Sequence, residues 1–320
     1  MAPRTVDVPA LVESARAGSP RAVARLISLV EDGHPALREV MAALAPHSGQ
    51  AHIIGITGSP GVGKSTSTNA LVGALRKQGK RIGILAVDPS SPFSGGALLG
   101  DRVRMQDHAL DPDVYIRSMA SRGHLGGLSW TTPQALRVLD AAGCDVILVE
   151  TVGVGQSEVE VAGLADTTIV LLAPGMGDGI QAAKAGILEI GDVFVVNKAD
   201  RDGADATVRD IRHMISLGDR TEPGLWRPPV IKTVAQQGQG IDEVIEAIEK
   251  HTSWMEESGT LRERRIRRAG DEIESIALQA LRAKMGDLRH GNGVEELAAA
   301  VVDGTTDPYA AADQVVDALA

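Results

Sequence analysis

The stretch Gly58-Ser59-Pro60-Gly61-Val62-Gly63-Lys64-Ser65 is the feature that most limits what this chain can fold into. It matches the phosphate-loop pattern G-x-x-x-x-G-K-[ST] at every fixed position. An apolar run at 53–56 precedes it, and a helical pattern follows from 66 to about 78. This strand–loop–helix context distinguishes a phosphate loop from a glycine-rich turn that happens to carry a lysine. We therefore expect the loop to hold the phosphates of a nucleotide.

The residue types of the loop fit phosphate chemistry. Glycine allows unusual backbone dihedrals and a close approach to a ligand. Backbone N–H groups, and the positive end of the helix that starts near Lys64, would face phosphate oxygens. Lys64 would reach the β- and γ-phosphates, and the Ser65 hydroxyl would bind Mg²⁺. The nucleotide contacts predicted here are Gly58, Pro60, Gly61, Val62, Gly63, Lys64, Ser65 and Thr66.

Strand and helix patterns alternate from residue 51 onward. Near-continuous apolar runs at 146–149 and 169–172 suit strands that are buried on both faces. Strands that alternate with helices predict an α/β fold, a P-loop NTPase with a mostly parallel sheet flanked by helices. Ligands bind such sheets at the carboxyl ends of the strands. Strands are expected at 51–57, 82–87, 114–118, 145–150, 167–173, 193–197 and 229–233.

Helical segments flank this central region. Residues 1–49 are predicted to be a helical N-terminal extension that packs on the nucleotide domain or binds a partner. The P-loop domain is expected to cover 50–255, and a helical C-terminal arm 256–320. Apolar residues at three- and four-residue spacing in 261–288 fit either a self-association arm or a helix packed on the domain.

Acidic residues stand where Mg²⁺ and water would be needed. Asp88 ends the second strand and could hold Mg²⁺ directly or through water. Asp101 lies near the start of the next helical pattern and could cap that helix or reach the metal. Glu150 ends another strand, three residues before Gly153. In this position the carboxylate suits metal-bound water and the Gly153 N–H suits the γ-phosphate, the alternative being a solvated turn glutamate.

The sequence Asn197-Lys198-Ala199-Asp200 after a buried strand indicates the base. An aspartate accepts two hydrogen bonds from guanine N1–H and N2, which adenine does not offer. ATP would leave that carboxylate unpaired, at a cost of roughly 1–3 kcal/mol. Asn197 would brace the loops, and Lys198 would lie along the base plane. The backbone of Thr233, Val234 and Ala235 could cover guanine O6, so GTP is favoured over ATP.

A glycine-rich loop follows the strand at 167–173. It contains Asp178 and Lys184 and precedes a helical pattern. Both residues fit a mobile switch that contacts a partner or the nucleotide. A helix cap and a surface lysine are the alternatives.

The composition restricts the class of protein. A formal net charge of −10 argues against a general nucleic-acid surface. The one cysteine, Cys144, excludes an internal disulfide and fits the reducing cytoplasm, most simply as a core residue. We find no signal-peptide pattern and no apolar stretch of about 18 residues, so we expect no membrane span.

Four motifs taken together resemble one family. The loop at 58–65, Asp88-Pro89-Ser90-Ser91, Glu150-Thr151-Val152-Gly153-Val154-Gly155-Gln156 and Asn197–Asp200 are similar to those of the methylmalonyl-CoA mutase-associated GTPases, the MeaB/ArgK type. The resemblance spans nearly the whole chain, including both helical extensions. It departs from the family at Val234, where a serine is usual.

The resemblance implies a function. Members are homodimeric GTPases that act as chaperones of an adenosylcobalamin-dependent acyl-CoA mutase, with GTP hydrolysis gating cofactor delivery and protecting the mutase. By match, Asp88, Asp101 and Glu150 surround Mg²⁺ and catalytic water, with Lys64, Asp101 and Glu150 as catalytic residues. The segment at 175–184, with Asp178 and Lys184, matches a third switch that responds to the mutase, and Gln156 belongs with the switch residues.

Two other functions are compatible with a P-loop. A metal-insertion GTPase would need a His-rich or Cys-containing motif, whereas the eight histidines here are scattered and Cys144 stands alone. A small-molecule kinase or transport-linked ATPase would transfer phosphate to an acceptor, and the guanine motif argues against ATP. Hydrolysis by a regulatory GTPase is expected to be slow until a partner accelerates it.

Overall fold

The structure is a computed structural model that describes residues 6–88, 106–108, 110–120, 131–151, 157–175, 186, 188–217, 224–290 and 293–317. The chain divides into two compact units, Met1–Arg265 and Ile266–Ala320. The predicted nucleotide motifs all fall in the first unit.

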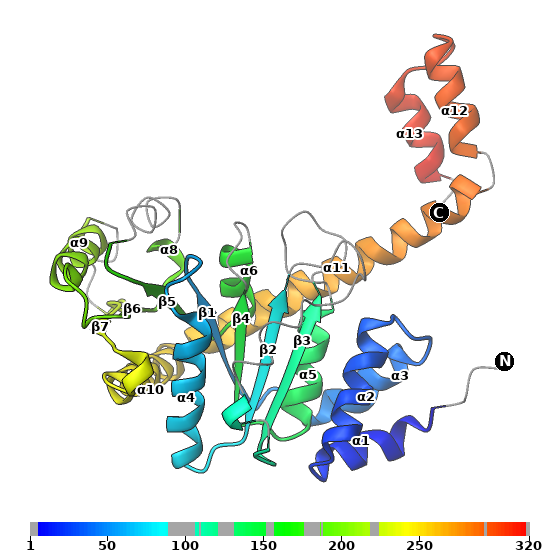
Figure 1. Cartoon of the computed structure of the whole chain (residues 1–320). Helices are drawn as coiled ribbons and strands as arrows, with labels where there is room; N and C mark the ends of the chain where they lie inside the picture. The colour runs from blue at the N-terminus through cyan, green and yellow to red at the C-terminus, as the bar shows by residue number, and fades with distance from the viewer. Residues whose placement is uncertain are drawn as a thin grey trace. The chain divides into compact units, whose positions relative to one another are not determined.

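A seven-stranded sheet lies at the centre of the first unit (Figure 1), in the order β3-β2-β4-β1-β5-β6-β7. Every neighbouring pair of strands is parallel. The expected α/β fold with a parallel sheet is confirmed, and each predicted strand is present with its ends shifted by two residues at most. The strands are β1 (His52–Thr57), β2 (Ile82–Asp88), β3 (Val114–Ala120), β4 (Val146–Thr151), β5 (Thr167–Leu172), β6 (Val193–Val196) and β7 (Val230–Lys232).

Helices cover both faces of the sheet. On one face, Ile54 and Leu148 pack against α4 (Lys64–Lys77) and α10 (Ile241–Ser258). On the other, Ile53 and Val149 pack against α5 (Thr132–Ala141) and the N-terminal helices. Alternate residues of one strand thus enter different cores, which is why these strands are apolar without a polar face. The remaining helices of this layer are α6 (Ser157–Leu164), α8 (Leu188–Ile190) and α9 (Ala204–Ser216).

The N-terminal extension forms three helices, α1 (Val8–Arg16), α2 (Pro20–Glu31) and α3 (Leu37–Leu44). The Ser19 side chain accepts a hydrogen bond from the Ala22 N–H, and Pro20 opens α2. Ser19 is thus an N-cap residue, followed by proline at the first helical position, where its missing N–H costs nothing. Val23, Leu26 and Ile27 are buried in the same core as α5. The extension therefore shares its hydrophobic core with the sheet.

Short helical turns complete the described part of the first unit: η1 (Ala45–His47), η2 (Gln106–His108) and η4 (Ala235–Gln237). Cys144 is buried in the core beside α5, as predicted. Burial raises the pKa of its thiol to about 12, so the thiol stays protonated at neutral pH.

Helix α11 (Thr260–His290) begins in the first unit and continues into the second. The second unit ends in two short helices, α12 (Gly293–Val302) and α13 (Pro308–Asp317). Among its described side chains several large apolar ones are exposed: Ile266, Ile273, Ile276, Leu278, Leu281, Val302, Tyr309 and Val316. None of the helices in the described ranges is both long and apolar enough to cross a membrane.

Candidate functional site

The phosphate loop connects the end of β1 to the start of α4, at the centre of the sheet. Parallel pairing places the carboxyl ends of β4 and β5 on either side of β1. The phosphate loop therefore lies at the carboxyl ends of the central strands, where α/β sheets bind ligands.

Close contacts with neighbouring atoms exclude any residue but glycine at two positions of the loop. Gly58 has a φ of +143°, and a side chain there would collide with the Leu171 carbonyl of β5. Gly63 has a φ of +97°, and a Cβ atom there would lie 2.5 Å from Asn197 Nδ2. A residue with a side chain would be strained in both backbone conformations. The loop is thus packed against the ends of β5 and β6.

Lys64 is folded over the loop that precedes it. Its side chain is buried, and Nζ donates to the Gly58 carbonyl at 2.6 Å and to the Ser59 carbonyl at 3.3 Å. Lys64 is also the first residue of α4, whose initial N–H groups have no partner within the helix. A cation and a helix N-terminus at one point form a site suited to a polyanion such as a triphosphate.

Hydroxyl groups of α4 converge on Glu150 of β4. Ser65 Oγ donates to Glu150 Oε1 at 2.7 Å, and Thr68 Oγ1 donates to Glu150 Oε2 at 3.1 Å. Glu150 is only 2% exposed, so it is not the solvated turn glutamate considered as its alternative. A hydroxyl and a carboxylate are oxygen ligands of the kind that Mg²⁺ prefers, so the residues fit that ion. Ser65 and Glu150 are the described residues that would hold it.

Thr68 was not among the predicted site residues. It stands three positions after Ser65, on the same side of α4. The spacing of two hydroxyl residues in the first turns of a phosphate-loop helix was the signal available in the sequence. That signal could not identify the acceptor, because Glu150 is 82 residues away.

Asn197 joins the phosphate loop to the loop after β7. Its Nδ2 donates to the Val62 carbonyl at 2.9 Å. Its Oδ1 accepts from Thr233 Oγ1 at 3.2 Å and from the Ala235 N–H at 3.1 Å. With only 3% of its surface exposed, the amide is a buried brace between the two segments. The sequence Thr233-Val234-Ala235 is thereby held beside the phosphate loop.

The residues on either side of Ala199 differ in their surroundings. Lys198 has a φ of +56°, the one positive φ outside glycine among the described residues, and its Nζ donates to the Gly61 carbonyl at 2.6 Å. The Ala199 N–H donates to the Thr233 carbonyl at 3.0 Å. Asp200 is exposed. A carboxylate open to solvent beside a fixed lysine stem can accept hydrogen bonds from a base placed over the loop.

Several predicted residues lie outside the described part of the chain. These are Asp101, Gly153, Gln156, Asp178 and Lys184, and the side chain of Asp88, whose backbone ends β2. Among the described residues no three His, Cys, Asp or Glu side chains form a group that could hold a metal. The structure therefore brings together Lys64, Ser65, Glu150 and the Asn197 loop, and leaves the predicted switch residues untested.

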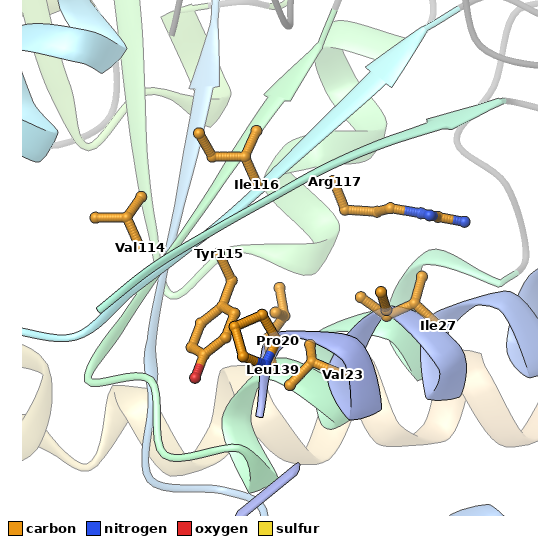
Figure 2. A pocket seen from close by; sticks show the side chains of 9 residues that line it. Pro20, Val23, Ile27, Val114, Tyr115, Ile116, Arg117 and Leu139 are labelled. Atoms are coloured by element: carbon orange, nitrogen blue, oxygen red, sulfur yellow. The ribbon is translucent and has the colours of Figure 1, made fainter. Parts of the chain in front are cut away.

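Two cavities lie on the flanks of the sheet. One of 520 Å³ lies beside the phosphate-loop helix, between α4 and η4, and is lined by Thr66, Asn69, His108, Ala235 and others. Because Thr66 and Ala235 are both predicted nucleotide contacts, this cavity adjoins the site. Another, of 470 Å³, lies between α2 and β3 (Figure 2). Tyr115 points from β3 toward Pro20 and Val23 there, and no predicted site residue lines it.

A second set of charged residues lies at the amino ends of the strands, away from the phosphate loop. Arg264 forms two hydrogen bonds of 2.9 Å with the carboxylate of Asp192, which precedes β6. Arg265 contacts Asp166, which precedes β5, at 3.0 Å. Both aspartates are buried. These bidentate pairs fasten the first turns of α11 to the sheet.

Comparison with known proteins places these motifs in context. Residues 23–288 match the family model described as "Methylmalonyl Co-A mutase-associated GTPase MeaB". A protein of Pyrococcus abyssi, named as a GTPase, is 48% identical over 96% of this chain and 95% of its own length. A mouse protein named "Methylmalonic aciduria type A homolog, mitochondrial" is 42% identical over 66% of this chain and 52% of its own.

Among solved structures, one titled "Crystal structure of LAO/AO transport system kinase" is similar to this chain with a TM-score of 0.72. It is 26% identical in sequence, and the match covers 99% of both chains. The similarity supports the α/β fold of the first unit.

Proposed function

Because this chain belongs to the MeaB family of methylmalonyl-CoA mutase-associated GTPases, and is itself a P-loop GTPase, we propose that it serves as a chaperone of a mutase. In this proposal, GTP binding and hydrolysis gate cofactor delivery to an adenosylcobalamin-dependent acyl-CoA mutase and protect that enzyme. The description of the matched family names this mutase, and a relative is named for methylmalonic aciduria.

The buried Asn197 brace is the observation that carries the nucleotide half of the proposal. It joins the phosphate loop to the Thr233–Ala235 backbone. The segments proposed to contact the phosphates and the base are therefore held together by one side chain. Asp200 would accept hydrogen bonds from guanine, and Lys198 would lie along the base.

The phosphate end would work through Lys64, Ser65 and Glu150. Lys64 would leave the loop carbonyls and donate to the β- and γ-phosphates, since a charged acceptor binds its ammonium group more strongly. Mg²⁺, when bound, neutralises charge that develops on the transferring phosphate. Ser65 and Glu150 would hold that ion, with Asp88 and Asp101, and Glu150 would orient the attacking water. Gly153 would contact the γ-phosphate.

A partner would act on the switch residues Gln156, Asp178 and Lys184. Intrinsic hydrolysis is slow in this proposal, since most switch GTPases need a partner to supply missing transition-state stabilisation. The exposed large apolar side chains of α11 within the second unit support a homodimer formed by the C-terminal arm, because contiguous apolar surface is normally covered. A single, buried, free thiol fits the cytoplasm.

The experiment that tests the proposal measures GTP hydrolysis with and without the cognate mutase. We expect the mutase to raise the rate, and the GTP- and GDP-bound forms to bind it with different affinity. The control is a different mutase from the same organism, one that does not bind this protein. If neither the rate nor the affinity changes, the proposed partner is wrong, although the protein is still a GTPase.

A phosphotransferase is the second candidate, since a solved structure that matches this chain is titled a transport system kinase. Such an enzyme would transfer the γ-phosphate of a nucleotide to an acceptor. The guanine motif at Asn197–Asp200 opposes the use of ATP. Radiolabelled γ-phosphate that appears only as inorganic phosphate would exclude this candidate.

A further inference from the structure

The hydroxyl of Thr68 lies beside Glu150, the carboxylate of the candidate site, without an assigned role. The side chain is fully buried at 0% exposure. Its Oγ1 lies 3.1 Å from Glu150 Oε2, while Ser65 Oγ lies 2.7 Å from Glu150 Oε1. Each oxygen of the carboxylate is therefore met by a different hydroxyl of the same helix.

We propose that Thr68 is a positioning residue whose hydroxyl sets the plane of the Glu150 carboxylate for Mg²⁺-dependent GTP hydrolysis. The proposal rests on the GTPase activity and on the role proposed for Glu150, and it does not depend on a mutase. Thr68 would act through Glu150 and would touch neither nucleotide nor metal.

The geometry of a glutamate explains why a second hydrogen bond matters. The last torsion of a glutamate side chain is broad, so a carboxylate held at one oxygen can still turn about its final bond. Holding Oε1 and Oε2 from two hydroxyls on one helix removes that freedom. Ser65 is itself predicted to offer its oxygen to Mg²⁺, which makes its bond to Oε1 dependent on the metal. Thr68 is not proposed to bind Mg²⁺, so its hydrogen bond to Glu150 Oε2 can persist both with and without the metal.

The proton of Thr68 has two acceptors within reach. Oγ1 also lies 3.0 Å from the Lys64 carbonyl, the contact that a helical threonine commonly makes four residues back. A hydroxyl carries one proton and can donate to only one of them. Hydrogen bonds to ionised acceptors are roughly twice as strong as neutral ones. As an ionised ligand of Mg²⁺, Glu150 would be the stronger of the two acceptors for this proton.

The competing explanation is that Thr68 only stabilises the start of α4. Two hydroxyl-free variants, Thr68→Val and Thr68→Ala, separate the roles, and Thr68→Ser restores the hydroxyl. Ser67→Ala is the matched control, since Ser67 is also buried on the same turn and its hydroxyl has no hydrogen-bond partner among the described residues. Glu150→Gln shows the effect of altering the carboxylate itself.

The first readout is binding and needs no turnover. Fluorescent GDP is titrated with Mg²⁺ and with a chelator, and the ratio of the two dissociation constants measures how strongly Mg²⁺ tightens nucleotide binding. We expect Thr68→Val and Thr68→Ala to reduce this ratio about 10-fold, the value of one hydrogen bond to a charged group. Affinity in the chelator should stay at the level of the unaltered protein.

The second readout is intrinsic GTP hydrolysis. We expect kcat to fall about 10- to 100-fold in both hydroxyl-free variants while KM for GTP changes little, since a misaligned carboxylate affects the transition state more than binding. Thr68→Ser should recover most of the rate, and Ser67→Ala should match the unaltered protein.

Two outcomes would overturn the proposal. Thr68→Val and Thr68→Ala could show an unchanged Mg²⁺ ratio and kcat, or they could lose affinity equally with and without Mg²⁺ together with a lower melting temperature. The second pattern assigns Thr68 to the helix alone. If Glu150→Gln also leaves the Mg²⁺ ratio unchanged, then the role proposed for Glu150 fails and Thr68 has nothing to position.

Discussion

Replacing Asn197 by alanine should cost both stability and nucleotide affinity. The side chain makes three hydrogen bonds in a buried setting, to the Val62 carbonyl, Thr233 Oγ1 and the Ala235 N–H. Each such bond contributes a net 0.5–1.5 kcal/mol, so the variant should lose about 2–4 kcal/mol of unfolding free energy. Alanine cannot form these hydrogen bonds, so the buried Ala235 N–H and Val62 carbonyl would each lose a partner.

This loss should be visible in two assays. Urea unfolding should show a lower midpoint with an unchanged slope, and the melting temperature should drop by roughly 4–10 °C. Affinity for fluorescent GDP should fall more than stability alone explains, because the phosphate loop and the 233–235 backbone are no longer joined. The increase in unfolding free energy that a given concentration of GDP causes should therefore be smaller in the variant than in the unaltered protein.

Asp200→Asn is the matched comparison for Asn197→Ala. Asp200 is exposed, so its replacement should leave the free energy of unfolding within about 0.5 kcal/mol of the original. An Asn197→Ala variant with unchanged stability would refute the reasoning from buried hydrogen bonds. An unstable variant that binds GDP normally would refute the idea that the brace serves the nucleotide.

Three further outcomes are expected. Asp200→Asn should weaken GTP binding and improve XTP binding, measured by competition against fluorescent GDP; unchanged GTP affinity would contradict the guanine assignment. Burial raises the pKa of Cys144 from 9.0 to about 12, so above pH 9 the unfolded chain loses a proton that the folded chain keeps. Stability should therefore fall with rising pH by up to about 1.4 kcal/mol per unit in this window, and Cys144→Ala should lack that contribution in denaturant titrations at alkaline pH. Asp192→Asn should destabilise by about 3–5 kcal/mol because it leaves Arg264 without its buried charge partner, whereas Asp205→Asn at an exposed ion pair should cost less than about 1 kcal/mol. Equal unfolding midpoints for the two aspartate variants would show that the Arg264 pair contributes no more than a surface pair.

Much of the fold could be predicted from the sequence because its signals are local. Apolar runs marked the central strands, and Ser19-Pro20 marked the start of α2. The glycines of the phosphate loop were likewise readable, since glycine tolerates the positive φ that these positions adopt. Helix α10 continues to Ser258, because no proline or glycine interrupts it before Gly259.

The site was predictable in its parts but not in its connections. The sequence identified Lys64, Ser65, Glu150 and Asn197 as separate motif residues. It could not show that Thr68 shares Glu150 with Ser65, or that Asn197 reaches back 135 residues to the Val62 carbonyl. Those contacts depend on the strand order around β1, which no local pattern specifies.

The sequence alone thus determined the class of fold and the chemistry of its loops, through residue types and spacing. The tertiary structure decided which of those loops touch, because neighbouring strands in the sheet are distant in the chain. Glu150 became a buried acceptor between two hydroxyls only because β4 lies beside β1, level with the residues that lead into the phosphate loop. The order and register of parallel strands are set by the packing of the whole sheet against both helical layers.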